Sequence, residues 1–248
     1  MRRAADEWSG LAFAVDLRGL REAFGDVRHE PDADAVHALR TAMARVDAWL
    51  ALEGLRGLRR RTRAVRRASG AVRDLDVLLA TALPPEVRRD LRGQRVEAAR
   101  ALREVLADDE TSTVLRELDA VVPASRHGVD IRLRRLAHRA LAARGSEHRG
   151  RRARHRLRRR LRVLRDALAV LGLDAGPLRA LVTALGRVRD HEAAAQCSGE
   201  PAVLAPFVHW HARERRRWRR RAARLEPAAM HLAADVQRRG RDAVAAAE

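Results

Sequence analysis

The sequence predicts an all-α protein, and three observations support this fold class. Of its 248 residues, 46% are hydrophobic but only 3% are aromatic, with no Tyr, so Leu, Val and Ala must fill the core. Apart from Val, these residues are strong helix formers, as are Arg and Glu. Apolar residues recur at steps of three and four, and no persuasive period-two run indicates a strand. A chain of this length can bury one large core or two small ones.

The charge of the chain indicates a polyanionic partner. The 52 basic residues outnumber 33 acidic ones, giving a formal net charge of +19, and all 52 are Arg. Such an excess suits nucleic acid, an anionic membrane surface or inorganic polyphosphate. Arginine donates two parallel hydrogen bonds to phosphate. The absence of Lys excludes a Walker-type phosphate loop and every Schiff-base mechanism.

The cysteine content and the N-terminal sequence predict the compartment. A single cysteine, Cys197, excludes an internal disulfide and a Cys-based zinc cluster, and it fits a reducing cytosol. The apolar run Leu11–Val15 is too short for a signal peptide, and no run approaches a membrane span. We therefore expect a soluble cytoplasmic protein without a membrane partner, a metal or a cofactor.

The first two helices are predicted from apolar periodicity and capping residues. Trp8–Phe24 is expected to form a helix that Gly25 ends. Asp32 or Asp34 can cap a second helix from Ala35 to about Glu53.

Glycines and prolines divide the middle of the chain. Leu58–Ser69 is predicted as a helix that Gly70 breaks, and a helix from Pro84-Pro85 is expected to reach about Ala107. Pro123 ends a shorter helix. Residues 123–128 are the best linker, so we expect a first half over about 8–122, a second half over about 129–225 and a C-terminal helical extension over about 226–248.

The most basic stretch, His148–Arg165, holds ten arginines and two histidines, with no acid until Asp166. Leucines recur through it and beyond it at steps of four and three: Leu157, Leu161, Leu164, Leu168 and Leu171. At about 100° per residue, a second face is cationic: Arg151, His155, Arg158, Arg162 and Arg165. This helix is predicted to have a core side and a polyanion-binding side, and a merely solvated arginine face is the alternative.

The basic helix repeats an earlier pattern. His37-Ala38-Leu39-Arg40 matches His155-Arg156-Leu157-Arg158 as His-x-Leu-Arg. A glycine and an Arg-Asp pair follow in both copies: Gly70 with Arg73-Asp74, and Gly186 with Arg189-Asp190. The offsets, 118 residues between the histidines and 116 between the glycines, are nearly in register. We infer an internal duplication that gives two pseudo-symmetric four-helix bundles, whose paired basic helices can face a basic central groove.

These residues resemble the CHAD family, the conserved histidine α-helical domain. The family pattern joins a Val-His-x-hydrophobic-Arg helix to a Leu-Gly-x-x-Arg-Asp-x-Asp segment. Here it reads Val36-His37-Ala38-Leu39-Arg40 and then Gly70-Ala71-Val72-Arg73-Asp74-Leu75-Asp76. His155–Arg158 and Leu185–Asp190 form a weaker second copy, and Trp210–Arg224 resembles the closing helix of the family. The similarity extends over roughly residues 10 to 225.

The resemblance implies a helical domain of two four-helix bundles that binds inorganic polyphosphate in a basic groove without turning it over. Family members usually carry basic residues seven and ten positions after the first histidine, where this chain has Ala44 and Asp47. The second copy keeps Arg162 and Arg165 there. The expected polyphosphate-binding residues are His37, Arg40, Arg45, Arg59, Arg63, Arg66, Arg73, Arg151, His155, Arg158, Arg159, Arg162, Arg165 and Arg189, with more weight on the second copy.

Other interpretations remain open for several residues. His37 and His155 stand beside apolar faces, where hydrogen-bonded structural histidines are common. Arg73 can equally form an internal salt bridge with an acidic residue. The run Arg213–Arg224, with Trp210 and Trp218, is a second basic patch that could stack nucleic-acid bases. Two tryptophans eight residues apart on a helix are, however, more often core.

An enzyme is not expected. The triphosphate-tunnel enzymes that are often joined to CHAD domains use an alternating Glu strand with Lys, and this chain has neither. The expectation is a non-catalytic polyphosphate-binding module at cytoplasmic polyphosphate granules, as the resemblance implies. A nucleic-acid-binding helical protein is the alternative, with nucleic acid expected to bind more weakly than polyphosphate. A scaffold for acidic proteins comes third, and the oligomeric state is left open.

Overall fold

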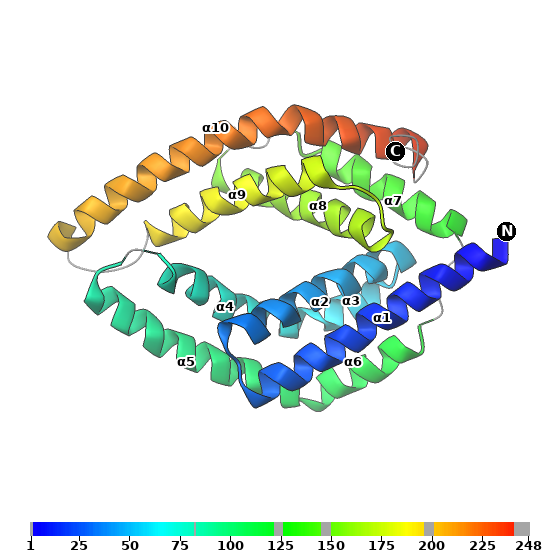
Figure 1. Ribbon diagram of the computed structural model, residues 1–248, viewed down its shortest axis with the longest axis horizontal. Coiled ribbons are helices and arrows are strands. Elements are labelled where there is room, and N and C mark those ends of the chain that lie inside the picture. The colour runs from blue at the N-terminus through cyan, green and yellow to red at the C-terminus, as the bar shows by residue number, and fades with distance from the viewer. Residues whose placement is uncertain (1, 82, 122–125, 145–149, 196–200, 241–248) are drawn as a thin grey trace. The chain divides into compact units, whose positions relative to one another are not determined.

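The protein is helical throughout the part of the chain that the structure describes. The computed structural model describes residues 2–81, 83–121, 126–144, 150–195 and 201–240. Helices fill these ranges and no strand occurs in them: α1 Arg2–His29, α2 Ala33–Glu53, α3 Arg56–Arg61, α4 Arg63–Leu79, α5 Pro85–Ala107, α6 Asp109–Asp119, α7 Arg126–Leu141, α8 Arg151–Val170, α9 Gly176–Ala194 and α10 Pro201–Arg239 (Figure 1). The all-α prediction is confirmed.

The chain divides into two compact units. Unit 1 comprises residues 1–50, 55–123 and 193–209, and therefore α1, most of α2, and α3 to α6. Unit 2 comprises residues 51–54, 124–192 and 210–248, and therefore α7, α8, most of α9 and the larger part of α10.

Unit 1 is held together by apolar helix faces and by ion pairs between short helices. In its core, Phe13 of α1 meets Trp49 of α2 edge to face, with ring centroids 6.1 Å apart. The helices α4 and α5 pack along each other around Leu83, Val87 and Leu91. Arg61 then ties α3 to α6 through Glu110 and Glu117, with both contacts 2.5 Å long.

Unit 2 is organised around the leucine face of α8. Leu157, Leu161, Leu164 and Leu168 are completely buried, and Leu171 nearly so. The facing helices contribute Leu133 of α7 and Leu178 of α9 to the same core. This burial confirms the predicted core side of α8 and leaves its arginines on the other faces.

Two predicted helix boundaries are wrong because glycine does not end these helices. α1 continues through Gly25 to His29, since Val27 is fully buried and extends the apolar face. α4 likewise continues through Gly70, and the break in the predicted Leu58–Ser69 helix falls instead at Thr62. Thr62 is buried, and its hydroxyl donates to the carbonyl of Arg59, so the chain turns where a polar side chain can satisfy the backbone.

Other predicted boundaries are confirmed or corrected in detail. Asp32 caps α2, because its Oδ1 accepts a hydrogen bond of 2.7 Å from the amide of Ala35. The predicted linker 123–128 is shorter than expected: α7 begins at Arg126, and residues 123–125 lie outside the described residues. Of the expected C-terminal extension over about 226–248, residues 226–239 form the last part of α10, and residues 241–248 lie outside the described residues.

Candidate functional site

An arginine packed against a glycine is the common feature of the two motif copies. In unit 1, a β-carbon placed on Gly70 would lie 3.1 Å from Nη1 of Arg40. In unit 2, a β-carbon on Gly186 would lie 3.5 Å from Nη2 of Arg158. Both glycines stand inside helices, so their role is close approach rather than helix termination. In each unit the arginine three residues after the histidine is thereby held against the partner helix.

Most of the remaining arginines predicted in unit 1 are paired with buried acids. Arg45 donates to Oδ1 of Asp16, whose other oxygen accepts 2.8 Å from the indole of Trp49. Arg59 forms two hydrogen bonds of 2.9 Å to Asp47, and Arg66 also pairs with that carboxylate. Asp47 itself is nearly buried.

The pairing of Asp47 gives a physical account of the departure from the family pattern. The carboxylate at this α2 position neutralises charge that arrives from α3 and α4. Of the other candidates in unit 1, His37 and Arg63 are exposed and Arg73 is half-buried. Of the predicted unit 1 arginines, the structure thus brings Arg59 and Arg66 together on Asp47 and holds Arg45 on Asp16.

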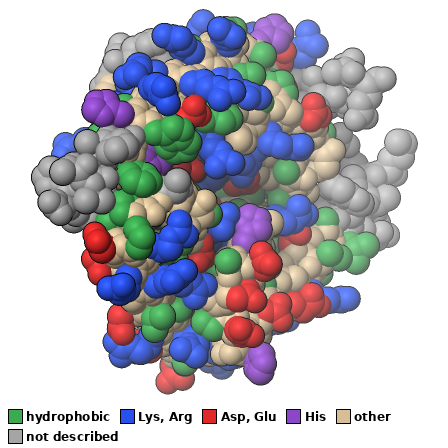
Figure 2. All heavy atoms as spheres, turned by 60° about the vertical axis from the view of Figure 1, so that its left-hand side comes forward, with side chains coloured by type: hydrophobic (Ala, Val, Ile, Leu, Met, Phe, Trp, Pro, Cys, Tyr) green, Lys and Arg blue, Asp and Glu red, His purple; other side chains and the backbone are tan. Residues whose placement is uncertain are grey.

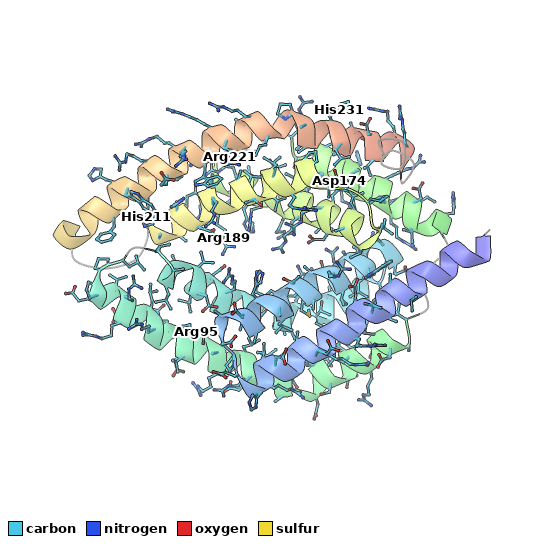
Figure 3. All side chains as sticks on the ribbon, viewed as in Figure 1. Arg95, Asp174, Arg189, His211, Arg221 and His231 are labelled. Carbon is cyan, nitrogen blue, oxygen red and sulfur yellow. The ribbon has the colours of Figure 1, made fainter. Side chains whose placement is uncertain are left out.

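In unit 2, four arginines converge on one histidine. The pKa of His155 is lowered below its ordinary value, first because partial burial removes water from the ring. The nearby positive charges of Arg159, Arg189, Arg158 and Arg162 lower it further. Three of these arginines belong to α8 and Arg189 to α9 (Figure 3), so the predicted α8 face is extended by the neighbouring helix.

The other predicted residues of unit 2 differ in their surroundings. Arg151 and Arg159 are exposed. Arg165 is held by Asp166, the acid that follows it, with Nε 2.8 Å from the carboxylate. The paired Arg165 contributes less positive charge to the surface than its position in the sequence suggests.

Two acids with buried side chains form ion pairs that sequence reasoning did not predict: Asp76, which closes the first motif, and Glu192, which lies just beyond the second copy. Asp76 of α4 accepts 2.9 Å from Nε of Arg95 on α5 (Figure 3). Glu192 of α9 accepts 3.0 Å from Arg219 on α10, and it also pairs with Arg154. The two acids occupy the same place in the two motifs, two residues after the Arg-Asp pair, and this repeated position is the signal that could have identified them. Through these ion pairs, each acid joins its motif helix to neighbouring helices.

The tryptophans of α10 do not form the core that helical spacing favoured. Trp210 is 40% exposed. Trp218 is half-buried, and the guanidinium carbon of Arg221 lies 5.1 Å from its ring centroid. The buried face of α10 is formed instead by His211 and by smaller apolar residues such as Ala229 and Ala233.

Neither a metal cluster nor a membrane span occurs in the described part of the chain. No group of three or more His, Cys, Asp and Glu side chains among these residues could hold a metal ion. None of the described helices has an apolar stretch long enough to cross a bilayer. Cys197 lies outside the described residues.

Comparison with known proteins decides the family. The family model described as CHAD domain matches residues 12–177, about two thirds of the chain. The chain belongs to the CHAD family. The match includes both His-x-Leu-Arg helices of this CHAD protein and ends before Gly186 and Arg189. A search of curated proteins finds no match.

Solved structures agree with the fold of this CHAD protein. The CHAD domain from the plant Ricinus communis superposes with a TM-score of 0.59 at 18% identity, covering 97% of this chain and 89% of that one. PptA from Streptomyces chartreusis gives a TM-score of 0.62, also at 18% identity, covering 92% of this chain and 98% of that one. At this identity the likeness establishes the all-α fold.

Proposed function

We propose that this CHAD protein binds inorganic polyphosphate without catalysing its turnover, and that it does so at polyphosphate granules in the cytoplasm. The observation that carries the proposal is the convergence of arginines on His155 in unit 2, with charge contributed by both α8 and α9. Membership of the CHAD family supports it.

The electrostatics of α8 favour an anionic ligand. Like charges three and four residues apart weaken a helix, and here Arg158 and Arg162 both act on His155. A chain of phosphates lying along this face would relieve the repulsion and hydrogen-bond to the guanidinium forks. Burial of the leucine face of α8 leaves these arginines on other faces of the helix. The common central groove for both motif copies stays a prediction.

The residue types present favour binding over catalysis. The chain has no Lys, and its candidate residues are cations that can position phosphates rather than groups arranged to attack them. Purified protein is therefore expected to leave long polyphosphate at full length after incubation with Mg²⁺ or Mn²⁺. Shortening of the polymer that is lost when an acidic residue of the chain is replaced would contradict the non-catalytic part of the proposal.

Competition separates polyphosphate from nucleic acid as the main ligand. Labelled long-chain polyphosphate bound to the protein is displaced with unlabelled polyphosphate, single-stranded RNA or duplex DNA at about 0.15 M salt. We expect polyphosphate to compete at phosphate concentrations at least roughly tenfold lower, about 1.4 kcal/mol. Its charge is dense and carries no sugar or base. A salt titration cannot replace this test, since both ligands release counterions.

The result that overturns the proposal is equal competition per phosphate. If RNA or DNA displaces labelled polyphosphate as effectively as polyphosphate does, then the α8 surface is a general polyanion surface and nucleic-acid binding becomes the better function. Absence of any polyphosphate binding by the folded protein would also overturn it.

A further inference from the structure

One face of α10 combines arginines with an exposed tryptophan and lies outside the candidate polyphosphate-binding set. Its residues follow at steps of three, four, four and three: Trp210, Arg213, Arg217, Arg221 and Arg224. At about 100° per residue these steps keep them on one side of the helix. At about 1.5 Å per residue they extend over about 20 Å. We call this set the α10 face.

The arginines of the α10 face are exposed and barely neutralised. The side chain of Arg217 is 78% exposed. Within the described residues, its carboxylate contact is with Glu214 at 3.7 Å, and Arg213 and Arg224 have none. A solvent-exposed pair of that length contributes little. Figure 2 draws arginine side chains in blue, and they cover much of the face turned to the viewer, its upper part included.

Trp210 is fixed on one side and open on the other. Its ring meets His191 and His211 edge to face, with centroids 5.4 Å and 4.7 Å away. The remaining 40% of the residue is exposed to solvent. A large ring that neighbours already hold loses little conformational freedom when a planar ligand stacks on it.

Most partner classes do not fit this combination. A membrane-binding helix needs a broad apolar face beside its basic one, whereas the α10 face is cationic along most of its length. A second copy of the chain would bring the same positive charges together. An acidic protein surface would pair with the arginines but would offer no planar group to stack on the exposed ring of Trp210.

Single-stranded nucleic acid fits both parts of the α10 face. Proteins that bind single strands combine a basic track along the backbone with aromatic rings on which bases stack. We propose that the α10 face binds single-stranded nucleic acid, with its arginines on backbone phosphates and Trp210 stacked on a base. This activity is separate from the proposed polyphosphate binding, because none of its residues belongs to the α8 and α9 set.

The test compares two substitutions on α10. The charge-reversal variant is R213E/R217E/R224E, and the stacking variant is W210A. Affinity for a fluorescently labelled oligothymidylate is measured by anisotropy at about 0.15 M salt. We expect a loss of at least roughly tenfold for the first, and of at least about fivefold for the second. W210F keeps a ring and is expected to retain most of the affinity. Polyphosphate affinity, measured in parallel, should change less than about threefold.

A matched control removes the effect of net charge. Arg89, Arg92 and Arg103 are exposed on one face of α5 in unit 1. The variant R89E/R92E/R103E changes the net charge by the same amount and should bind the oligonucleotide like the unmodified protein. Helical circular dichroism of every variant checks that the fold is kept.

Several outcomes would overturn the proposal. Equal losses of oligonucleotide affinity in the α5 and α10 charge variants would mean that the affinity depends on net charge alone and not on the α10 face. Unchanged affinity in W210A would remove base stacking, and equal loss of polyphosphate binding in the α10 variants would make the face part of the polyphosphate surface. Absence of oligonucleotide binding by the unmodified protein would end the proposal, while the parallel polyphosphate measurement would test the proposed function separately.

Discussion

At the scale of single residues, Gly186 offers a direct test of how the motif arginine is held. The alanine variant G186A should be more stable than the unmodified protein by about 0.5–1 kcal/mol, because alanine loses less backbone entropy in a helix. The added β-carbon would meet Arg158 at 3.5 Å, an ordinary van der Waals distance, so no strain opposes the gain. Thermal unfolding should show a rise in Tm of about 1–4 °C.

The corresponding change in unit 1, G70A, is the comparison. There the new β-carbon would approach Nη1 of Arg40 to 3.1 Å, and the guanidinium would have to shift. We expect G70A to be less stabilising than G186A. A larger gain for G70A would mean that Arg40 is not held against Gly70.

The contacts of a residue could be predicted from the sequence where its partners lie on the same helix. The convergence of Arg158, Arg159 and Arg162 near His155 follows from helical spacing and was predictable. The pairing of Asp47 with Arg59 and Arg66 was not, because it requires the connection after Glu53 to bring α3 beside α2 and the turn at Thr62 to orient α4. The sign of this pairing in the sequence is Asp47 itself, an acid at a position where family members usually carry a basic residue.

At the scale of elements, a histidine pair joins α9 to α10. Nδ1 of His191 lies 3.0 Å from Nδ1 of His211, so one ring must donate and the other accept. His211 is almost completely buried. Burial lowers the pKa of both rings. For His191, Glu214 and Asp190 oppose this shift and Arg187 adds to it, while His191 further lowers the pKa of His211.

This pair makes the packing of α9 on α10 sensitive to acid. Because both pKa values are lowered on folding, the unfolded chain takes up protons first. Stability is therefore fully present above about pH 6.5, the ordinary histidine value, and is lost as pH falls from there through the lowered values. Thermal unfolding between pH 7.5 and 5.5 should show a decreasing Tm. In H211F the curve should start lower and be flatter, and an unchanged slope would contradict the role of the pair.

Helices were predictable where both period and caps lay in the sequence, as for α2 with its Asp32 cap and α5 after Pro84. Boundaries at Gly25 and Gly70 were not, because a helix passes through glycine when its buried face continues or when a neighbouring side chain fills the space. Whether a glycine ends a helix therefore cannot be predicted without knowing how the neighbouring helix packs against it.

At the scale of the whole molecule, the two motif copies have similar construction, but their arginines have different surroundings. Each has an arginine against a glycine and a buried acid tying the motif helix to its neighbours. This similarity agrees with the predicted duplication, which itself stays a prediction. The sequence revealed the repeated residues, but it could not reveal which arginines each unit neutralises, because that depends on packing between helices.

The pairing of unit 1 arginines with buried acids predicts that unit 2 contributes more to polyphosphate binding than unit 1. In unit 1, Arg45, Arg59 and Arg66 are engaged by Asp16 and Asp47. A bound phosphate would have to compete with these carboxylates for the guanidinium groups, so these cations gain less from the ligand. In unit 2, Arg159 of α8 is exposed, and its positive charge is the largest of the four that lower the pKa of His155.

Two variants with equal charge change test this asymmetry. R151E/R159E alters exposed residues of α8, and R63E/R73E alters an exposed and a half-buried residue of α4. Arg158 is avoided because it packs against Gly186. We expect R151E/R159E to weaken polyphosphate binding by at least roughly tenfold at about 0.15 M salt, and R63E/R73E by less than about threefold. Helical circular dichroism and Tm should stay close to those of the unmodified protein for R151E/R159E, since its positions lie off the buried leucine face of α8. Equal losses of affinity in the two variants would mean that phosphate displaces the unit 1 carboxylates from their arginines. A larger loss for R63E/R73E would assign the main binding surface to the first motif copy.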